Sequence, residues 1–333
     1  MSAFIKSLAA VLATIITFFG ITLTTDEDLP IDSQNGGDPF IVEYEGETYY
    51  TYTTGGGVDI IKIKNFRDAS EYLQKKVVFW SGWNDTVGDI WAPEIHRIGD
   101  RWYIVATALF DKEKVPKGKM PLGDPDKEDN DYYRYTFVLE SETEDIMSDY
   151  TFKGYLAPNG LNNIDGTYLQ KDGKLYYVCS AYRDIGNQAL YICEMENPYT
   201  LKGEAVEISY PKYSWEKRGW PVNEGPAVLY HGEDLFIVYS ASGFSSDHYC
   251  MGMLTFKGGD VMDKTSWKKS PVRVSYHKPL KEIYNAGHCS FLYRENGDIY
   301  TVFHANREME FDNTPRLTYV QKLEFSNGKP SFK

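Results

Sequence analysis

The stretch "EGPAVLYHGEDLFIVYS" at 224–240 repeats a phrase that stands earlier in the chain, "DGTYLQKDGKLYYVCS" at 165–180. Each phrase begins with an acid, passes through a polar turn that contains glycine, and continues in an aromatic or aliphatic run. Two short runs of β-forming residues around such a turn are typical of a β-hairpin. The phrase therefore predicts a strand, a tight turn and a second strand.

The same pattern occurs three more times, so the chain carries five copies of the hairpin phrase. In each copy a hydrophobic residue stands eleven positions after the first residue, and a turn with Gly or Asp lies between them. The first residues, here called the heads, are Asp38, Trp91, Asp165, Glu224 and His288. They recur at intervals of roughly 60 residues, and a period of this kind indicates repeated structural units.

Further strand-like runs lie between the hairpins, among them "YRYTFVLES" at 133–141 and "YCMGMLTF" at 249–256. Each period therefore holds about four strands, and four-stranded units repeated around an axis form a β-propeller. We predict an all-β fold, a five-bladed β-propeller that forms one domain over 26–333. A two-sheet β-sandwich is the structural alternative, and the repeat argues against it. The charged segment 111–131 is predicted to be a long loop inside the second unit.

The first 25 residues differ from the rest of the chain. They hold one lysine, no acid, and an apolar run from Leu8 to about Leu23. This composition is typical of a secretory signal peptide, and a membrane anchor is the alternative. We therefore predict a signal peptide or N-terminal anchor at 1–25 and a secreted, extracellular protein. If the segment is an anchor and is not cleaved, it would attach the protein to a membrane.

Composition excludes several classes of partner and site. The net charge of −13 argues against a nucleic-acid partner, which requires a basic surface. The four cysteines include no C-x-x-C pair, so a structural zinc site is not expected. Cys179 and Cys193 flank a predicted turn, and we expect them either to pair across that hairpin or to stay free in the core. The sequence does not indicate an oligomeric state.

The heads should converge at one end of the propeller axis, because the innermost strand of each blade begins there. Three heads are acids, Asp38, Asp165 and Glu224. One acid at a hairpin start is ordinarily a turn or cap residue. Three acids in one register are costly to bury together unless the charge is used, either by a metal or in acid/base catalysis. Clustered carboxylates shift each other's pKa values, so one stays protonated while another ionises, as glycoside hydrolysis requires.

Tryptophans near the heads fit a sugar partner, because an aromatic ring stacks on the C–H face of a sugar. Trp91 is itself a head, and Trp215 and Trp220 lie in the loop directly before Glu224. Packing in the core is the alternative for each of these side chains.

Four motifs resemble those of glycoside hydrolase family 43, five-bladed propeller enzymes that act on arabinose- and xylose-containing plant polysaccharides. The motifs are "DPFIVEYEGETYYTYTT" (38–54), "IWAPEIHRIGDRWYIV" (90–105), "IDGTYLQKDGKLYYV" (164–178) and "NEGPAVLYHGEDLFIVYSAS" (223–242). The resemblance extends from about Asp38 to Phe332, which is nearly the whole chain after the first 25 residues.

The resemblance implies a role for each site residue. Asp38 would be the general base, Glu224 the general acid, and Asp165 the acid that tunes the pKa of Glu224 and helps orient it. Trp91 and Arg316 would bind the sugar, although Arg316 could also be an ordinary surface arginine. His288 would contact the substrate region near the axis and help hold a calcium ion or its waters, with a hydrogen-bonded core histidine as the alternative.

The activity implied by the resemblance is inverting release of L-arabinofuranose from arabinan or arabinoxylan side chains. The phrase "VYSASGFSSDHYCMGML" at 238–254 is most similar to the α-L-arabinofuranosidase branch. A β-xylosidase, an endo-arabinanase, a non-catalytic carbohydrate-binding propeller and a metal-centred structural propeller remain alternatives. The expected partner is a plant cell-wall polysaccharide or oligosaccharide. No cofactor is expected to be required for the chemistry, and a calcium ion in the propeller centre is expected from the resemblance alone.

Overall fold

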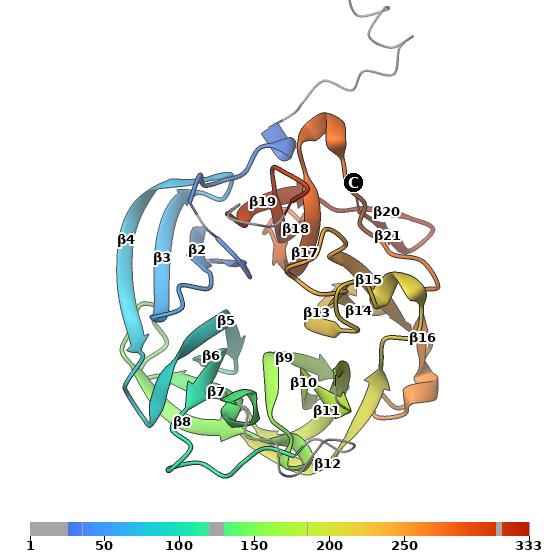
Figure 1. Ribbon diagram of the computed structural model, residues 1–333. Helices are drawn as coiled ribbons and strands as arrows, with labels where there is room; N and C mark the ends of the chain where they lie inside the picture. Colours follow the sequence, from blue (N-terminus) through green and yellow to red (C-terminus); the bar gives the residue numbers. More distant parts are fainter. Residues whose placement is uncertain (1–25, 35, 120–129, 185, 311–314, 333) are drawn as a thin grey trace, which may run out of the picture.

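The computed structural model describes residues 26–34, 36–119, 130–184, 186–310 and 315–332 (Figure 1). The predicted signal peptide or anchor at 1–25 lies outside these residues. No helix in the described part of the chain is long and apolar enough to cross a membrane.

Five antiparallel sheets stand side by side around one axis (Figure 1), and their strands follow one another in sequence order within each sheet. Blade 1 contains β1 (Phe40–Tyr44), β2 (Glu47–Thr51), β3 (Gly57–Asn65) and β4 (Asp68–Trp80). Blade 2 contains β5 (Thr86–Ile98), β6 (Arg101–Phe110), β7 (Arg134–Ser141) and β8 (Tyr150–Leu156). Blade 3 contains β9 (Asn163–Lys171), β10 (Lys174–Asp184), β11 (Asn187–Asn197) and β12 (Thr200–Ser209).

The last two blades complete the ring. Blade 4 contains β13 (Asn223–His231), β14 (Asp234–Ala241), β15 (Cys250–Phe256) and β16 (Trp267–Lys269). Blade 5 contains β17 (Tyr284–Tyr293), β18 (Ile299–Asn306) and β19 (Leu317–Lys322), and the hairpin of β20 (Glu324–Ser326) and β21 (Lys329–Ser331) follows it. Short 3-10 turns lie between strands: η1 (Asp26–Asp28), η2 (Asn130–Tyr133), η3 (Pro158–Gly160), η4 (Ser214–Glu216), η5 (Lys264–Ser266) and η6 (Pro279–Lys281). The predicted five-bladed propeller is confirmed.

Each predicted hairpin forms the first two strands of one blade. In blade 1 the turn is Glu45-Gly46, with φ values of 52° and 75°, and in blade 3 it is Asp172-Gly173, with the same values. Two successive positive φ angles are the conformation of a type I′ turn, whose twist matches that of the flanking strands. The predicted loop 111–131 leaves β6 and returns through η2 to β7, so its described part lies within blade 2 as expected.

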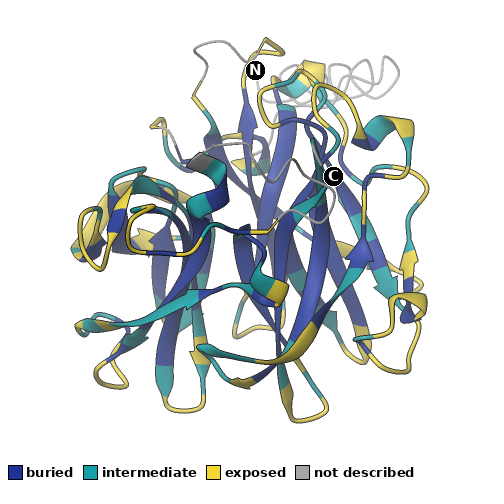
Figure 2. Cartoon of the chain, turned by 60° about the horizontal axis from the view of Figure 1, so that its bottom comes forward, coloured by how far each residue is buried: buried dark blue, intermediate teal, exposed yellow. Residues whose placement is uncertain are grey.

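The hydrophobic core consists of layers between neighbouring blades. Phe79 of β4, Trp102 of β6 and Phe137 of β7 belong to the layer between blades 1 and 2, and each is at most 2% exposed. Figure 2 shows buried residues along the strands and exposed residues at the turns of the blade ends. All four cysteines are free and buried in these layers, which answers the question left open for Cys179 and Cys193.

The N-terminal segment closes the ring against blade 5. The amide of Ile31 donates to the carbonyl oxygen of Thr318 at 2.9 Å, and the amide of Gly36 donates to that of Arg316 at 2.7 Å. A Cβ atom at Gly37 would lie 2.4 Å from the Arg316 guanidinium, so a larger residue here would displace that side chain. This seam, residues 31–34 and 36–38 against Arg316 and β19, brings the first head next to the last blade.

Candidate active site

One pocket of about 670 Å³ opens where the innermost strands begin. It is lined by all six residues that the sequence singled out, which come from every blade: Asp38, Trp91, Asp165, Glu224, His288 and Arg316. Of the two tryptophans in the loop before Glu224, Trp220 lines this pocket, whereas Trp215 faces a separate surface hollow.

An unusual backbone conformation recurs at the five heads. Residues Asp38, Asp165 and His288 have positive φ angles of 56°, 55° and 42°, and so do Ala92 at 46° and Gly225 at 52°, each directly after a head. The pairing register shifts at these points in blades 2 to 5. Such bulges turn a strand locally and redirect its side chains. The bulges therefore aim the heads into the pocket, at a backbone cost of roughly 1–3 kcal/mol for each non-glycine residue.

Asp38 is held by four polar neighbours. Its Oδ1 atom lies 3.0 Å from Nη1 of Arg316 and 3.2 Å from Nδ1 of His288. Its Oδ2 atom accepts a hydrogen bond from the Thr53 hydroxyl at 2.6 Å, and its backbone amide donates to Nδ1 of His304 at 3.0 Å. Burial by itself would raise the pKa of Asp38, but the Arg316 guanidinium and then the His288 ring outweigh it. The pKa of Asp38 therefore lies well below 3.8, and this carboxyl is ionised.

The pKa values of Asp165 and Glu224 are shifted in the opposite direction, upward. Asp165 Oδ2 accepts the backbone amide of Gly225 at 2.9 Å and lies 3.9 Å from Nδ1 of His288. Burial, together with the charge of Asp38, raises the pKa of Asp165 to about 6. Burial and then the charge of Asp165 raise the pKa of Glu224 to about 8. At neutral pH the pocket thus holds an ionised Asp38 and a protonated Glu224.

Tyr249, His304 and Thr53 lie around the carboxylates and were not predicted from the sequence. Tyr249 lines the pocket together with Glu224, and its ring stacks on the buried His304 at a centroid distance of 5.7 Å. A Cβ atom at Gly287 would lie 2.2 Å from the Tyr249 ring, so only glycine allows this approach. His304 on β18 and Thr53, which follows β2, both contact Asp38. No repeated pattern in the sequence marks either position.

Arg134 stacks on Trp91 in the wall of the pocket, a contact that the sequence did not predict. The guanidinium of Arg134 lies over the Trp91 ring at 3.8 Å. Its nitrogens are fixed by Asp89 at 3.0 Å and by Asp131 at 3.2 Å. Because Arg134 covers one face of the ring, Trp91 can offer only its other face or its edge to a ligand.

The residues around His288 do not fit a directly coordinated calcium ion, which takes about six to eight oxygen ligands. In the part of the chain that the structure describes, no group of three or more His, Cys, Asp or Glu side chains is arranged to hold a metal. The Nδ1 atom of His288 faces the carboxylates of Asp38 and Asp165. An ion at the propeller centre would therefore be held mainly through water. It stays a prediction, and no step proposed below depends on it.

Comparison with known proteins identifies the family. The model for "Glycosyl hydrolases family 43" matches residues 28–330, which includes all five blades. The chain belongs to glycosyl hydrolase family 43. The resemblance seen in the four motifs is thereby confirmed.

Relatives within family 43 share much of the chain. It is 32% identical over 315 residues to "Alpha-L-arabinofuranosidase 43" of Humicola insolens, covering 89% of this chain and 61% of that protein. It is 32% identical over 294 residues to "Extracellular exo-alpha-(1->5)-L-arabinofuranosidase" of Streptomyces chartreusis, covering 84% and 82%. The solved structure of α-L-arabinofuranosidase from Lactobacillus brevis matches with a TM-score of 0.78 and 28% identity, over 93% of this chain and 98% of that one. The chain thus spans about three fifths of the first relative's length.

Proposed function

We propose that the protein is an inverting glycoside hydrolase that releases L-arabinofuranose from arabinan or arabinoxylan side chains. The observation that carries the proposal is the division of charge in one pocket, with an ionised Asp38 and a protonated Glu224. A glycosidase that inverts needs this pair, a base for water and an acid for the leaving oxygen. The names of the family 43 relatives support arabinofuranose as the sugar.

In the proposed reaction, Asp38 takes a proton from a water molecule as that water's oxygen forms a bond to the anomeric carbon. Glu224 gives its proton to the glycosidic oxygen as the bond from that oxygen to the anomeric carbon breaks. Asp165 keeps the pKa of Glu224 high and makes no proton transfer itself. Arg316 and His288 keep Asp38 ionised, and the polar and aromatic pocket wall binds the sugar.

We also propose that the protein acts outside the cell on plant cell-wall polysaccharides or oligosaccharides. The apolar segment 1–25 and the word "extracellular" in the name of the Streptomyces relative support this location. Fractionation of cells that express the full chain tests it. Activity in the medium or on the cell surface is the expected result, and activity confined to the cytosol would contradict it.

The purified protein should hydrolyse p-nitrophenyl α-L-arabinofuranoside in preference to the β-D-xylopyranoside. Proton NMR in the first minutes should show the β-anomer of arabinose before mutarotation. Appearance of the α-anomer first would mean a covalent intermediate and would remove the base role from Asp38. Preference for the xyloside would make the protein a β-xylosidase, and internal cleavage of linear arabinan would make it an endo-arabinanase. Binding without turnover would leave a carbohydrate-binding propeller.

A further inference from the structure

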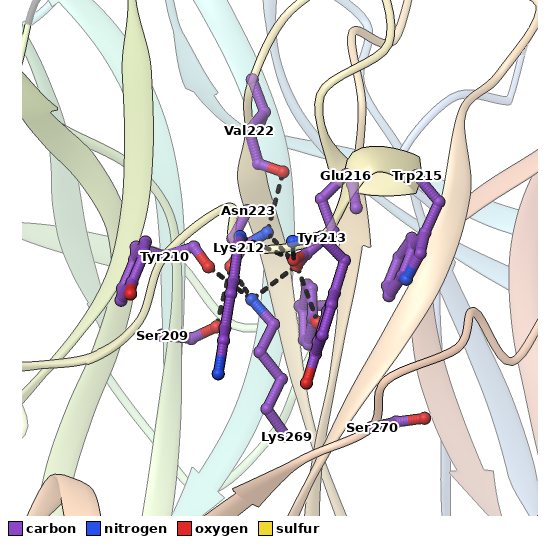
Figure 3. A network of polar contacts seen from close by, with 12 residues as sticks. Ser209, Tyr210, Lys212, Tyr213, Trp215, Glu216, Val222, Asn223, Lys269 and Ser270 are labelled. Atoms are coloured by element: carbon purple, nitrogen blue, oxygen red, sulfur yellow. Dashed lines mark hydrogen bonds and ion pairs between the residues drawn. The ribbon is translucent and has the colours of Figure 1, made fainter.

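A buried polar network lies behind the wall of the active-site pocket, in the loop that joins β12 to β13 (Figure 3). Its centre is Glu216, the last residue of η4, whose side chain has no exposed surface. The Oε2 atom of Glu216 accepts hydrogen bonds from the backbone amides of Lys212 and Tyr213, both at 2.8 Å. These two bonds fold the first part of the loop around the carboxylate.

The other oxygen of Glu216 joins the loop to blade 4. Its Oε1 atom accepts from the side-chain Nδ2 of Asn223 at 2.9 Å and from the Tyr239 hydroxyl at 3.0 Å. The same atom lies 2.5 Å from Nζ of Lys269. Tyr239 belongs to β14 and Lys269 to β16, the outermost strand of the blade. Both carboxylate oxygens of Glu216 are therefore fully used by protein groups.

The ammonium group of Lys269 is satisfied as completely. Besides Glu216, its Nζ atom donates to the backbone oxygen of Tyr210 at 2.5 Å and to Oδ1 of Asn223 at 2.8 Å. A lysine ammonium has three N–H donors, so these three acceptors occupy all of them. Only 14% of the Lys269 side chain is exposed. The Glu216 carboxylate thus accepts from the side-chain nitrogen of Asn223, and the Lys269 ammonium donates to its side-chain oxygen.

Asn223 directly precedes the candidate acid Glu224 at the start of β13, so the contacts that fix Asn223 also restrict the backbone at Glu224. Its Oδ1 atom also accepts from the Ser209 hydroxyl at 2.7 Å, and its backbone oxygen accepts from the Ser180 hydroxyl at 2.9 Å. Asn223 is completely buried. Its side chain and its backbone are therefore both fixed, which leaves the peptide unit before Glu224 little freedom to rotate.

The same loop forms part of the pocket wall. Gly219, Trp220 and Val222 line the pocket and follow Glu216 within six residues. The far side of the loop is tied to the end of β14, since the Arg218 amide donates to the Ser242 hydroxyl at 3.0 Å. A buried ion pair is seldom more stabilising than apolar residues of the same volume. Its presence at this place is better explained by the geometry that it imposes on the loop and on Asn223.

We propose that Glu216, Lys269 and Asn223 are positioning residues that orient Glu224 for proton transfer to the leaving oxygen. The inference rests on the proposed role of Glu224 as the general acid. It assigns a function to a cluster that touches neither the substrate pocket nor the other carboxylates. Small errors in the position of a reacting group lower the rate strongly, by about a hundredfold per 1 Å in some enzymes.

The test compares leaving groups, because a misplaced acid harms only those substrates that need a proton. Glu216→Gln, Asn223→Ser and the charge-free double variant Glu216→Gln/Lys269→Met are assayed on an aryl arabinofuranoside with a poor leaving group and on the dinitrophenyl arabinofuranoside. We expect kcat on the poor leaving group to fall about tenfold or more, with less than about threefold loss on the dinitrophenyl substrate. Arg294→Met is the matched control, since it removes the cation of another buried-carboxylate pair, Arg294 with Glu43 at 2.6 Å.

A loss of thermal stability alone does not support the inference, because the control should lose stability as well. Equal loss on both substrates, or unchanged kcat on both in folded protein, would overturn it. The double variant removes both charges together and leaves neither buried alone, so it decides the question if the single variants do not fold. Failure of the proposed function is recognised separately. If the wild type cleaves another glycoside instead, the leaving-group ratio is measured on that glycoside, and if it cleaves none, the role of Glu224 is wrong.

Discussion

Nη1 of Arg316 lies 3.0 Å from Oδ1 of Asp38, although the two residues are 278 positions apart in the chain. The contact crosses the seam where the N-terminal segment meets β19. It places a fixed positive charge on the carboxylate proposed to activate water. Several predictions about the charge state of the pocket depend on this and the neighbouring contacts.

Removal of the guanidinium should raise the pKa of Asp38. In the wild type this pKa is well below 3.8, so Asp38 stays ionised in mildly acidic solution. In Arg316→Met, Asp38 should become protonated at a higher pH, and activity should be lost earlier as the pH falls. The acidic limb of the kcat/KM profile measures this shift. Arg183→Met, which removes a surface arginine paired with Glu207, should leave the limb in place, and an unshifted limb in Arg316→Met would contradict the proposed contact.

Replacement of the base itself should be more severe. Asp38→Asn should lower kcat by about a thousandfold on substrates with good and poor leaving groups alike, because no other group activates water. Added azide should partly restore turnover if the variant leaves room for an anion to attack the sugar. Asp59→Asn is a suitable control, since Asp59 is a buried carboxylate of the same blade that pairs with Lys75 outside the pocket. Substantial activity without azide would exclude Asp38 as the base.

The acid should show a different dependence on the substrate. Glu224→Gln should reduce kcat by about a hundredfold or more with poor leaving groups and much less with dinitrophenyl arabinofuranoside. In the wild type, kcat/KM should fall as the pH rises through about 8, because Glu224 then loses the proton that it must donate. Glu233→Gln, in the exposed turn of the same hairpin, should change neither property. The same loss on both substrates would indicate another role for Glu224.

The raised pKa of Glu224 also predicts how stability changes with pH. The folded protein holds this proton up to about pH 8, whereas an unfolded chain releases it near 4.5. Between these values the folded state binds more protons, so the contribution of Glu224 to stability falls as the pH rises. Glu224→Gln, which stays neutral, should therefore gain thermal stability relative to the wild type between pH 5 and pH 8. A constant difference in Tm across this range would show that the pKa of Glu224 is not raised.

The calcium ion predicted at the propeller centre can be tested by chelation. If an ion lies beside His288 with water among its ligands, EDTA should lower the Tm or the activity, and added calcium should restore it. Magnesium added in place of calcium serves as the control, because its smaller octahedral shell fits such a site poorly. If EDTA changes neither property, His288 is better described as the neighbour of Asp38 and Asp165 that the structure shows.

The sequence was sufficient for the parts of the molecule that repeat. Five hairpin phrases in one register predicted five blades, and the heads of those phrases converge on one pocket. Tyr249, directly before β15, and His304, on β18, escaped prediction because no repeat marks them and their contacts depend on the packing of neighbouring blades. The loop before Glu224 was predicted only in part. Its two tryptophans look alike in the sequence, yet only Trp220 reaches the pocket.

The ion pair of Glu216 and Lys269 could not be predicted from the sequence either. The two residues are 53 positions apart and belong to no motif, so only the folded arrangement of blade 4 brings them together. A buried lysine and a buried glutamate each read as surface residues in a linear sequence.

Because of the seam between the N-terminal segment and β19, activity should depend on whether the ring of blades is closed. Of the six site residues, the four heads of blades 2 to 5 would keep their places in a molecule whose N-terminal segment had detached. Asp38 would leave with that segment, and Arg316 would lose its contact with Asp38. Such an opened ring would still have most of its sheets and its circular dichroism, but it would lack the carboxylate proposed to activate water. An increasing denaturant concentration should therefore abolish turnover before the sheets unfold. A covalent cross-link across the seam should make the loss of activity and the unfolding of the sheets coincide.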